Sequence, residues 1–347
     1  MPRLPPSLVT LARSQHSLLP LLLRQTRSLP LARSELRWLR EYVFQLPSSI
    51  SSPALHRARR HHLKRLCYHR SLGAPLQYLL KTQPFGTVEI LCGKGALIPR
   101  PETEGTVVKL FQTRRNGVAQ EGYGLRVLDL CTGPGSIALL AASLLHDSGS
   151  PSGYRVLGVD ISDRALRLAQ QSLTYNIANG ALPPAARQNV GFTKLDLLAT
   201  DHSAALSTIA SFFNHDFTSG REPESVVDII IANPPYISPQ GYWKDTSRSV
   251  RLYEPELALV PPPLPKPHGS DYLQEDSFYP AIESLATKLR APGLVLETGG
   301  NDQSARVQHM LAQRNWETSI WTDFAGIHRN VVAWRGNGSW SWLGSLS

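Results

Sequence analysis

The sequence predicts an α/β protein in which a Rossmann-like, mostly parallel sheet follows a small N-terminal helical domain. Three observations lead to this prediction. From about residue 120, short runs rich in Val, Ile and Leu alternate with stretches of helical periodicity, which is typical of a parallel sheet with helices on both faces. Before residue 82, apolar residues recur at helical spacing. A chain of 347 residues is also long enough for a main domain and a smaller one.

Five runs are predicted to be the strands of this sheet. They are LRVLDL (125–130), YRVLGVD (154–160), VGFTKLD (190–196), VVDIIIAN (226–233) and GLVLET (293–298). Helices are expected after the first two strands, over SIALLAASLLH and SDRALRLAQQSLTYNIAN, and a short one around 203–212. Ligands bind beyond the carboxyl ends of the strands in such sheets. The polar residues that follow the strands should therefore meet at one edge of the sheet.

Two helices are predicted before the sheet. In SELRWLREYVFQL the apolar residues recur at helical spacing, and Ser34 is placed to cap the helix. Ser52-Pro53 opens a second helix over about 52–70. Its basic face could contact RNA or an acidic partner, or could simply be a solvated surface. We expect proximity to RNA or the ribosome through this helix.

The net charge of +9 is concentrated at the N-terminus, because residues 1–70 hold 12 Arg and one Lys against two Glu. The first 33 residues contain five Arg and no acidic residue, and they are rich in Leu and Ser. That composition is typical of a mitochondrial transit peptide, which predicts the mitochondrial matrix as the location. The alternative is a disordered basic tail.

We therefore expect four segments along the chain. These are the transit peptide or tail (1–33), a helical substrate-recognition domain (34–82), a linker hairpin with the segment IPRPETE (83–120) and the sheet domain (121–340). The inserts at 146–154 and 198–225 and the proline-rich segment 260–271 are expected to be surface loops or linkers.

Composition excludes several classes of protein. There is no uninterrupted apolar stretch of about 18 residues, so no membrane span is expected. Three scattered cysteines are too few for a disulfide framework or a zinc site. We expect a reducing compartment, no metal and a monomer.

The turn DLCTGPGS (129–136) after the first strand is a candidate cofactor-binding turn. Its glycines allow the backbone to approach a ligand closely at a helix N-terminus, and it lacks the Lys-Ser/Thr pair of an ATP-binding loop. Asp160 ends the second strand, where an acid commonly binds ribose hydroxyls; the alternative is a helix N-cap. Asp196 and Leu197 end the third strand and are placed to hold an adenine amino group and ring face. The candidate residues in the turn are Asp129, Cys131, Thr132, Gly133, Pro134 and Gly135.

The segment Asn233-Pro234-Pro235-Tyr236 is a stiff, extended hook at the end of the fourth strand. The carboxamide oxygen of Asn233 and the carbonyl of Pro234 are two acceptors that match the two N–H groups of a planar –NH2, and Tyr236 can stack on its plane. A Rossmann-like sheet with a ribose-binding acid could hold NAD or S-adenosylmethionine, but NAD chemistry has no use for such a clamp. The hook predicts methyl transfer to an amide or aromatic amine nitrogen that is held by Asn233, Pro234 and Tyr236.

These motifs carry a resemblance to a known family. DLCTGPGS, NPPY and above all LIPRPETEG (97–105) resemble the HemK family of protein-(glutamine N5) methyltransferases, which methylate the glutamine in the Gly-Gly-Gln motif of peptide-chain release factors. Further matches extend the resemblance over about 35–335: GAPLQYLLKTQPFG, YEPELAL, LETGGNDQ and DFAGIHRNVVAW.

The resemblance implies a class I S-adenosylmethionine-dependent methyltransferase fold, that cofactor, and a release factor as the protein substrate. It implies that Asn233, Pro234, Pro235 and Tyr236 bind the glutamine side chain and form the catalytic set. It also implies that residues 131–135, Asp160, Leu197 and Asn233 line the cofactor pocket. The prolines of IPRPETE are expected to stiffen a linker between domains, while Arg100, Glu102 and Glu104 tie it to the edge of the sheet.

Two departures from the family pattern lie in the turn. Cys131 stands where many members have Gly, and we expect this to be tolerated only if its φ is negative and its side chain points away from the cofactor. Pro134 replaces a small residue and removes one N–H. Two other functions stay open on the residues alone: a nucleic-acid adenine-N6 methyltransferase, and a non-catalytic S-adenosylmethionine- or RNA-binding scaffold.

Overall fold

A computed structural model describes residues 3–45, 53–117, 124–147, 153–214, 225–263, 273–335 and 340–346. The chain forms two compact units. The first comprises Met1–Thr82 and Ser247–Glu254, and the second comprises Gln83–Thr246 and Pro255–Ser347. We call them the helical unit and the sheet unit.

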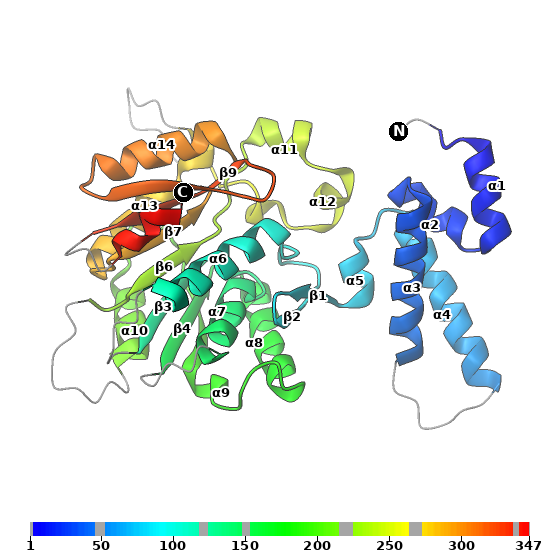
Figure 1. Ribbon diagram of the computed structural model, residues 1–347, viewed down its shortest axis with the longest axis horizontal. Coiled ribbons are helices and arrows are strands. Elements are labelled where there is room, and N and C mark those ends of the chain that lie inside the picture. The colour runs from blue at the N-terminus through cyan, green and yellow to red at the C-terminus, as the bar shows by residue number, and fades with distance from the viewer. Residues whose placement is uncertain are drawn as a thin grey trace. The chain divides into compact units, whose positions relative to one another are not determined.

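The sheet unit is built on seven strands in the order β5-β4-β3-β6-β7-β9-β8. Figure 1 labels β3, β4, β6, β7 and β9 of this sheet. The neighbours from β5 to β7 all pair in parallel, and β9 pairs antiparallel with both β7 and β8. This order with one reversed strand is that of a class I methyltransferase sheet, so the predicted fold class is confirmed. The strands are β3 (Leu125–Leu130), β4 (Tyr154–Asp160), β5 (Val190–Lys194), β6 (Ile229–Ala232), β7 (Gly293–Glu297), β8 (Glu317–Thr322) and β9 (His328–Trp334).

Helices cover both faces of the sheet, which explains why its central strands are apolar on both sides. Every residue of β3, β6 and β7 is buried. One core joins alternate strand residues to α6 (Pro101–Gly117), α7 (Ser136–Asp147) and α8 (Asp163–Ala178). The other joins the remaining residues to α10 (Ser203–Asn214), α13 (Phe278–Lys288) and α14 (Asn301–Ala312).

All five predicted strands are present, and β3 and β4 have the predicted bounds. The antiparallel pair β8 and β9 was not predicted. Most residues of β8 are exposed or partly exposed, and few of them are apolar, because a strand at the edge of a sheet needs fewer buried side chains. The predicted short helix after β5 is α10. Parts of the three predicted inserts, 148–152, 215–224 and 264–271, lie outside the described residues.

Shorter elements complete the sheet unit. A two-stranded sheet of β1 (Thr82–Phe85) and β2 (Val88–Leu91) leads into it. The helices α9 (Ala186–Asn189) and α11 (Pro239–Asp245) connect longer elements.

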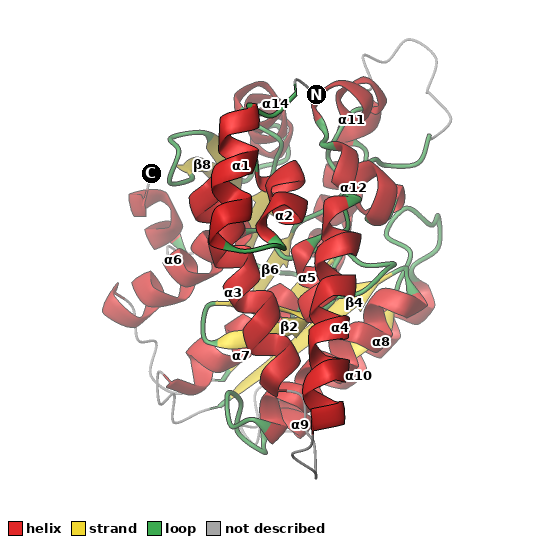
Figure 2. Ribbon diagram, turned by 90° about the vertical axis from the view of Figure 1, so that its right-hand side faces the viewer, coloured by secondary structure: helices red, strands yellow, loops and turns green. Residues whose placement is uncertain are grey.

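The helical unit contains α1 (Pro6–Gln15), α2 (Leu19–Thr26), α3 (Leu29–Gln45), α4 (Pro53–Ser71) and α5 (Leu76–Leu80), and α1 to α4 are visible in Figure 2. As predicted, Pro53 opens α4. Ser34 was predicted as a helix cap, but it lies inside α3, which already begins at Leu29. The sequence Leu29-Pro30 starts the helix one turn earlier because proline suits the first turn.

The alternative of a disordered basic tail is wrong for residues 3–33, which form helices in the structure, whereas the transit peptide stays a prediction. Leu19, Leu22 and Leu23 are buried on α2, where they pack in one core with Leu39 and Leu66 of α3 and α4. Their spacing places them on one face of a helix. The Leu-rich composition therefore supplies a folded core.

One element of the helical unit comes from far along the chain. The helix α12 (Arg248–Tyr253) contacts the end of α4, where Ser249 Oγ donates to the carbonyl of Gly73 at 2.7 Å. Within the unit, buried Glu35 accepts two hydrogen bonds of 2.8 Å from Arg70. Among the described residues, no helix is long and apolar enough to cross a membrane.

Candidate active site

A cavity of about 300 Å³ lies at the carboxyl ends of β3 to β6. The turn after β3 contributes Cys131 and Gly133, and the hook contributes Asn233 and Pro235. The other lining residues are Gly95, Ala96, Leu97, Val159, Asp160, Ile161, Ser162, Ala165, Leu195, Asp196, Leu197, Leu198, Pro255, Leu257, Ala258, Pro262 and Phe278. The structure thus brings residues from four predicted segments to one place.

The turn after β3 needs its glycines. Gly133 and Gly135 have φ values of 56° and 87°, in the region that favours glycine. A Cβ on Gly135 would lie 3.1 Å from Ala169 Cβ and from the Phe192 ring. The turn leads directly into α7, which begins at Ser136.

Asp129 lies behind this turn and does not line the cavity. It is fully buried and accepts hydrogen bonds from Thr132 Oγ1 and, at 3.0 Å, from the Ala138 N–H. Burial, opposed by these hydrogen bonds, raises the pKa of Asp129 to about 7. Asp129 therefore braces the turn, and Thr132, Pro134 and Gly135 likewise shape it without being among the lining residues.

The expectation for Cys131 is wrong on both counts. Its φ is 60°, in the left-handed region, and it is one of the residues that line the cavity. The reason is the backbone of the turn, which needs a left-handed residue where β3 ends, and a Cβ there costs about 1–2 kcal/mol relative to the right-handed form. Burial, with Asp160 and Asp129 nearby, raises the pKa of the thiol well above its usual value, so Cys131 is a neutral wall of the cavity.

Asp160 lines the cavity from the end of β4. Its Oδ2 accepts from the Gly133 N–H at 2.9 Å and its Oδ1 from the Ser162 N–H at 2.8 Å. The cap of α8 is Ser162, which accepts from the Ala165 N–H, so Asp160 is not the N-cap. The Ile161 N–H also donates to this carboxylate, which leaves about one of its four acceptor positions for a further donor. Burial raises the pKa of Asp160.

Asp196 and Leu197 line the cavity beyond β5. The Leu198 N–H donates to Asp196 Oδ1 at 3.0 Å, which turns the chain at this point. Leu197 is buried and, with Ile161 and Phe278, gives the cavity apolar walls. The cavity therefore has acidic side chains at Asp160 and Asp196, together with these apolar walls.

The hook is held from behind by residues that the sequence reading missed. The side-chain N–H of Asn233 donates to Thr103 Oγ1 at 3.1 Å, and Thr103 Oγ1 donates to Glu297 Oε2 at 2.7 Å. Tyr236 donates its hydroxyl to Glu297 Oε1 at 3.1 Å. Pro234 and Tyr236 are not among the lining residues. The Tyr236 ring packs against the core of the sheet unit, and its hydroxyl is bound to Glu297.

Thr103 belongs to the segment IPRPETE, whose predicted role as an interdomain linker is wrong. Pro101 is the first residue of α6, which packs in the core of the sheet unit. Proline in the first turn and acids in the first turn both favour a helix start. For Glu297 a signal was present: like Asp160, it ends a parallel strand at the edge where ligands bind.

The sequence is similar to curated proteins over nearly its whole length. A family model described as Eco57I restriction-modification methylase matches residues 154–256. The chain is 31% identical over 94% of both chains to a probable MRF1 mitochondrial N(5)-glutamine methyltransferase of Schizosaccharomyces pombe. It is 30% identical to the release factor glutamine methyltransferase of Bacillus subtilis, over 83% of both chains.

The chain belongs to the N(5)-glutamine methyltransferase family. A further relative is the mitochondrial MRF1 N(5)-glutamine methyltransferase of Saccharomyces cerevisiae, which is 32% identical over 75% of this chain and 68% of its own length. Membership of this family confirms the resemblance carried by NPPY and LIPRPETEG. It also confirms the prediction that the protein is an enzyme. A solved METTL16 methyltransferase domain, 13% identical over 79% of this chain and 82% of its own, has a TM-score of 0.44, which is too low to add to the assignment.

Proposed function

We propose that this enzyme transfers a methyl group from S-adenosylmethionine to the side-chain amide nitrogen of the glutamine in the Gly-Gly-Gln motif of a peptide-chain release factor. The observation that carries the proposal is the hook Asn233–Tyr236 at the edge of the cavity, with Asn233 and Pro235 in its lining. The names of the relatives, release factor and MRF1 glutamine methyltransferases, support the substrate.

The residues of the cavity fit the proposed cofactor. When bound, S-adenosylmethionine supplies an electrophilic methyl group on a cationic sulfur. Asp160 has acceptor capacity left for a ribose hydroxyl, Asp196 can accept from an adenine amino group, and Leu197 offers an apolar face to its ring. Cys131 and Gly133 lie next to Asp160, on the side that the methionine part would take.

The hook would act on the substrate by orientation. Asn233 Oδ1 and the carbonyl of Pro234 accept the two N–H bonds of the glutamine amide, which holds its nitrogen with one face open towards the cavity. Fixing a weak nucleophile in this way replaces a rare collision by a bound geometry. Two fixed acceptors also favour the pyramidal nitrogen that forms as amide resonance is lost.

Mass spectrometry tests the proposal. A release factor and an adenine-containing DNA duplex are incubated separately with the enzyme and S-adenosylmethionine. We expect one added methyl group on the glutamine of the Gly-Gly-Gln motif of the release factor. Methylation of the DNA alone would instead support the adenine-N6 alternative, and methylation of neither would support the non-catalytic scaffold.

We further propose that the enzyme works in the mitochondrial matrix. The names of two relatives support the coarser location, because they call those proteins mitochondrial. Cleavage near residue 33 would remove Leu22 and Leu23 from the core of the helical unit. We therefore infer that α1 and α2 are retained in the working protein, which we take to be a monomer.

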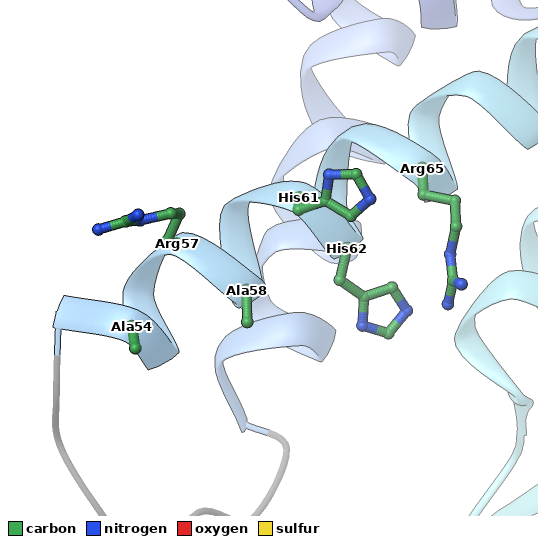
Figure 3. A pocket seen from close by; sticks show the side chains of 6 residues that line it. All are labelled: Ala54, Arg57, Ala58, His61, His62 and Arg65. Atoms are coloured by element: carbon green, nitrogen blue, oxygen red, sulfur yellow. The ribbon is translucent and has the colours of Figure 1, made fainter.

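A basic surface on the helical unit supports the expected proximity to RNA. The unit carries sixteen Arg and Lys against three Glu, a net charge of +13, whereas the rest of the chain carries twenty against twenty-four. Arg57, His61, His62 and Arg65 project from one side of α4 (Figure 3). Such a surface suits the phosphate backbone of RNA.

A second groove of the helical unit has the same character. It is lined by Arg33, Arg37, Arg40 and Arg60 together with Phe44, and the guanidinium of Arg40 lies 5.8 Å from the centre of the Phe44 ring. Arginines beside an aromatic ring are typical of single-stranded nucleic acid sites.

We expect binding of a 20-nucleotide RNA to weaken as the salt concentration rises, and we expect the double variant Arg57→Ala, Arg65→Ala to flatten that dependence. The control replaces the exposed Arg167 and Arg187 of the sheet unit. An acidic peptide that competes with RNA equally well would overturn the preference for RNA.

A further inference from the structure

We infer that Thr103 and Glu297 are positioning residues that set which way the Asn233 carboxamide faces, so that its oxygen, and not its nitrogen, meets the substrate. The inference deepens the proposed function and rests on it, since an acceptor is needed there only if the substrate brings an –NH2 group. Neither residue touches the cavity, so both would act through Asn233.

The orientation follows from counting protons. A threonine hydroxyl has one proton to donate. Thr103 gives that proton to Glu297 Oε2 at 2.7 Å, so towards Asn233, 3.1 Å away, its oxygen can only accept. The amide end next to Thr103 must then be the –NH2. The nitrogen and the oxygen of a carboxamide point in different directions. Asn233 lines the cavity, and its Oδ1 is therefore the end that remains to accept from a substrate.

Glu297 anchors both ends of the hook. Its second oxygen, Oε1, accepts the Tyr236 hydroxyl at 3.1 Å, so one buried carboxylate holds Asn233 through Thr103 and holds Tyr236 directly. Glu297 is only 3% exposed, at the end of β7. Its backbone carbonyl also accepts the Tyr279 hydroxyl at 3.0 Å. The anchor is therefore fixed by the sheet and by α13, and not by a surface loop.

The direction of the chain of hydrogen bonds depends on an ionised Glu297. A carboxylate only accepts, whereas a carboxylic acid can donate to Thr103. The Thr103 proton could then turn to Asn233 Oδ1, which would present the –NH2 of Asn233 to a substrate –NH2, donor against donor. Burial raises the pKa of Glu297 to about 7, opposed by Thr103, Tyr236 and Arg329 and assisted by Glu102. Arg329 and Glu102 are thus the charged groups that face it, from β9 and α6.

Three variants and a matched control test this inference. Thr103→Val keeps the shape but removes the hydroxyl, Thr103→Ser restores it, and Glu297→Gln removes the negative charge. The control is Thr106→Val on the same helix, because the buried Thr106 hydroxyl accepts from Asn330 and donates to the Glu102 carbonyl. Methylation of a release factor is followed with each enzyme, alongside S-adenosylmethionine affinity by calorimetry.

We expect Thr103→Val and Glu297→Gln to lower kcat by about 10- to 100-fold with unchanged cofactor affinity, and Thr103→Ser and Thr106→Val to stay within about threefold of the parent enzyme. The kcat of the parent should fall with acid through about pH 7, and that of Glu297→Gln should not. A merely structural role would not change substrate preference. In contrast, a freely turning Asn233 should improve the binding of a Gly-Gly-Glu peptide relative to its Gly-Gly-Gln counterpart in Thr103→Val. Parent-like kcat and preference in Thr103→Val would overturn the inference.

A measurement without turnover separates this inference from the proposed function. The side-chain –NH2 of Asn233, labelled with nitrogen-15 and assigned with Asn233→Ala, should shift in Thr103→Val and not in Thr106→Val. Should the parent enzyme methylate no release factor while this shift is seen, the proposed substrate fails and the orientation of Asn233 stands. An unmoved signal would mean that Thr103 does not hold the amide.

Discussion

At the scale of single residues, the site combines strain and rigidity. Cys131 adopts a left-handed backbone at φ 60° in the wall of the cavity, and non-glycine residues in that region cluster at functional sites. Asn233 faces the cavity with one end of its side chain bound to Thr103. The proposed chemistry would therefore depend on backbone and side-chain geometry that the neighbouring residues impose.

Asn233→Ala should lower kcat by more than about 100-fold, because it removes one of the two acceptors that would orient the substrate nitrogen. The substitution removes one side-chain hydrogen bond of the sheet unit, so the fold should persist. Turnover is compared with the thermal unfolding midpoint of the same preparations. Turnover within a few-fold of the parent enzyme would mean that Asn233 is not the clamp.

At the scale of elements, the site depends on where helices and strands end. The cavity is formed where β3 to β6 stop, and α7 and α8 begin beside it. The same holds behind the hook, where the first turn of α6 brings Thr103 to the end of β7. In the helical unit, α1 and α2 supply part of a core that also includes Leu39 and Leu66.

Leu22→Ala should destabilise the helical unit by about 3 kcal/mol, because Leu22 is fully buried on α2 and its removal leaves a cavity. Leu31→Ala is the matched control, since Leu31 is 56% exposed and should change stability by less than about 0.5 kcal/mol. Hydrogen exchange of α2 to α4 reads out the change. Equal protection in both variants would indicate that residues 19–26 contribute nothing to this core.

At the scale of the whole molecule, buried acids link stability to pH. The pKa values of Asp129 and Glu297 are both raised to about 7, in each case chiefly by burial. Between the ordinary pKa of a carboxyl and about pH 7, the folded state keeps protons that the unfolded chain releases. The free energy of unfolding therefore falls as pH rises through this range.

Glu297→Gln should remove the share of this pH dependence that Glu297 contributes. Relative to the variant, the parent enzyme should lose on the order of 3 kcal/mol of stability between about pH 4.5 and pH 7.5. Urea unfolding of both proteins across that range measures the difference. A constant difference at every pH would show that Glu297 titrates as an ordinary glutamate.

Charge also separates the two units. The helical unit has a net charge of +13 and the remainder of the chain has −4. Most of this basic charge lies in residues 1–70, where the sequence placed it. Composition reports charge and leucine content, but it does not show whether a helix packs into a core, so the burial of Leu22 and Leu23 could not be predicted from it.

The sequence by itself determined the strands β3 to β7, the glycine turn and the place of the hook at the end of β6, since each depends on residues that are neighbours in the chain. Periodicity, glycine at left-handed positions and paired prolines are local properties. Only the tertiary structure decided what stands behind the hook, because Thr103 and Glu297 are 194 residues apart and meet through the packing of α6 on the sheet. The left-handed Cys131 and the buried leucines of α2 were decided in the same way. Their conformation and burial depend on how the surrounding chain packs, which local sequence does not specify.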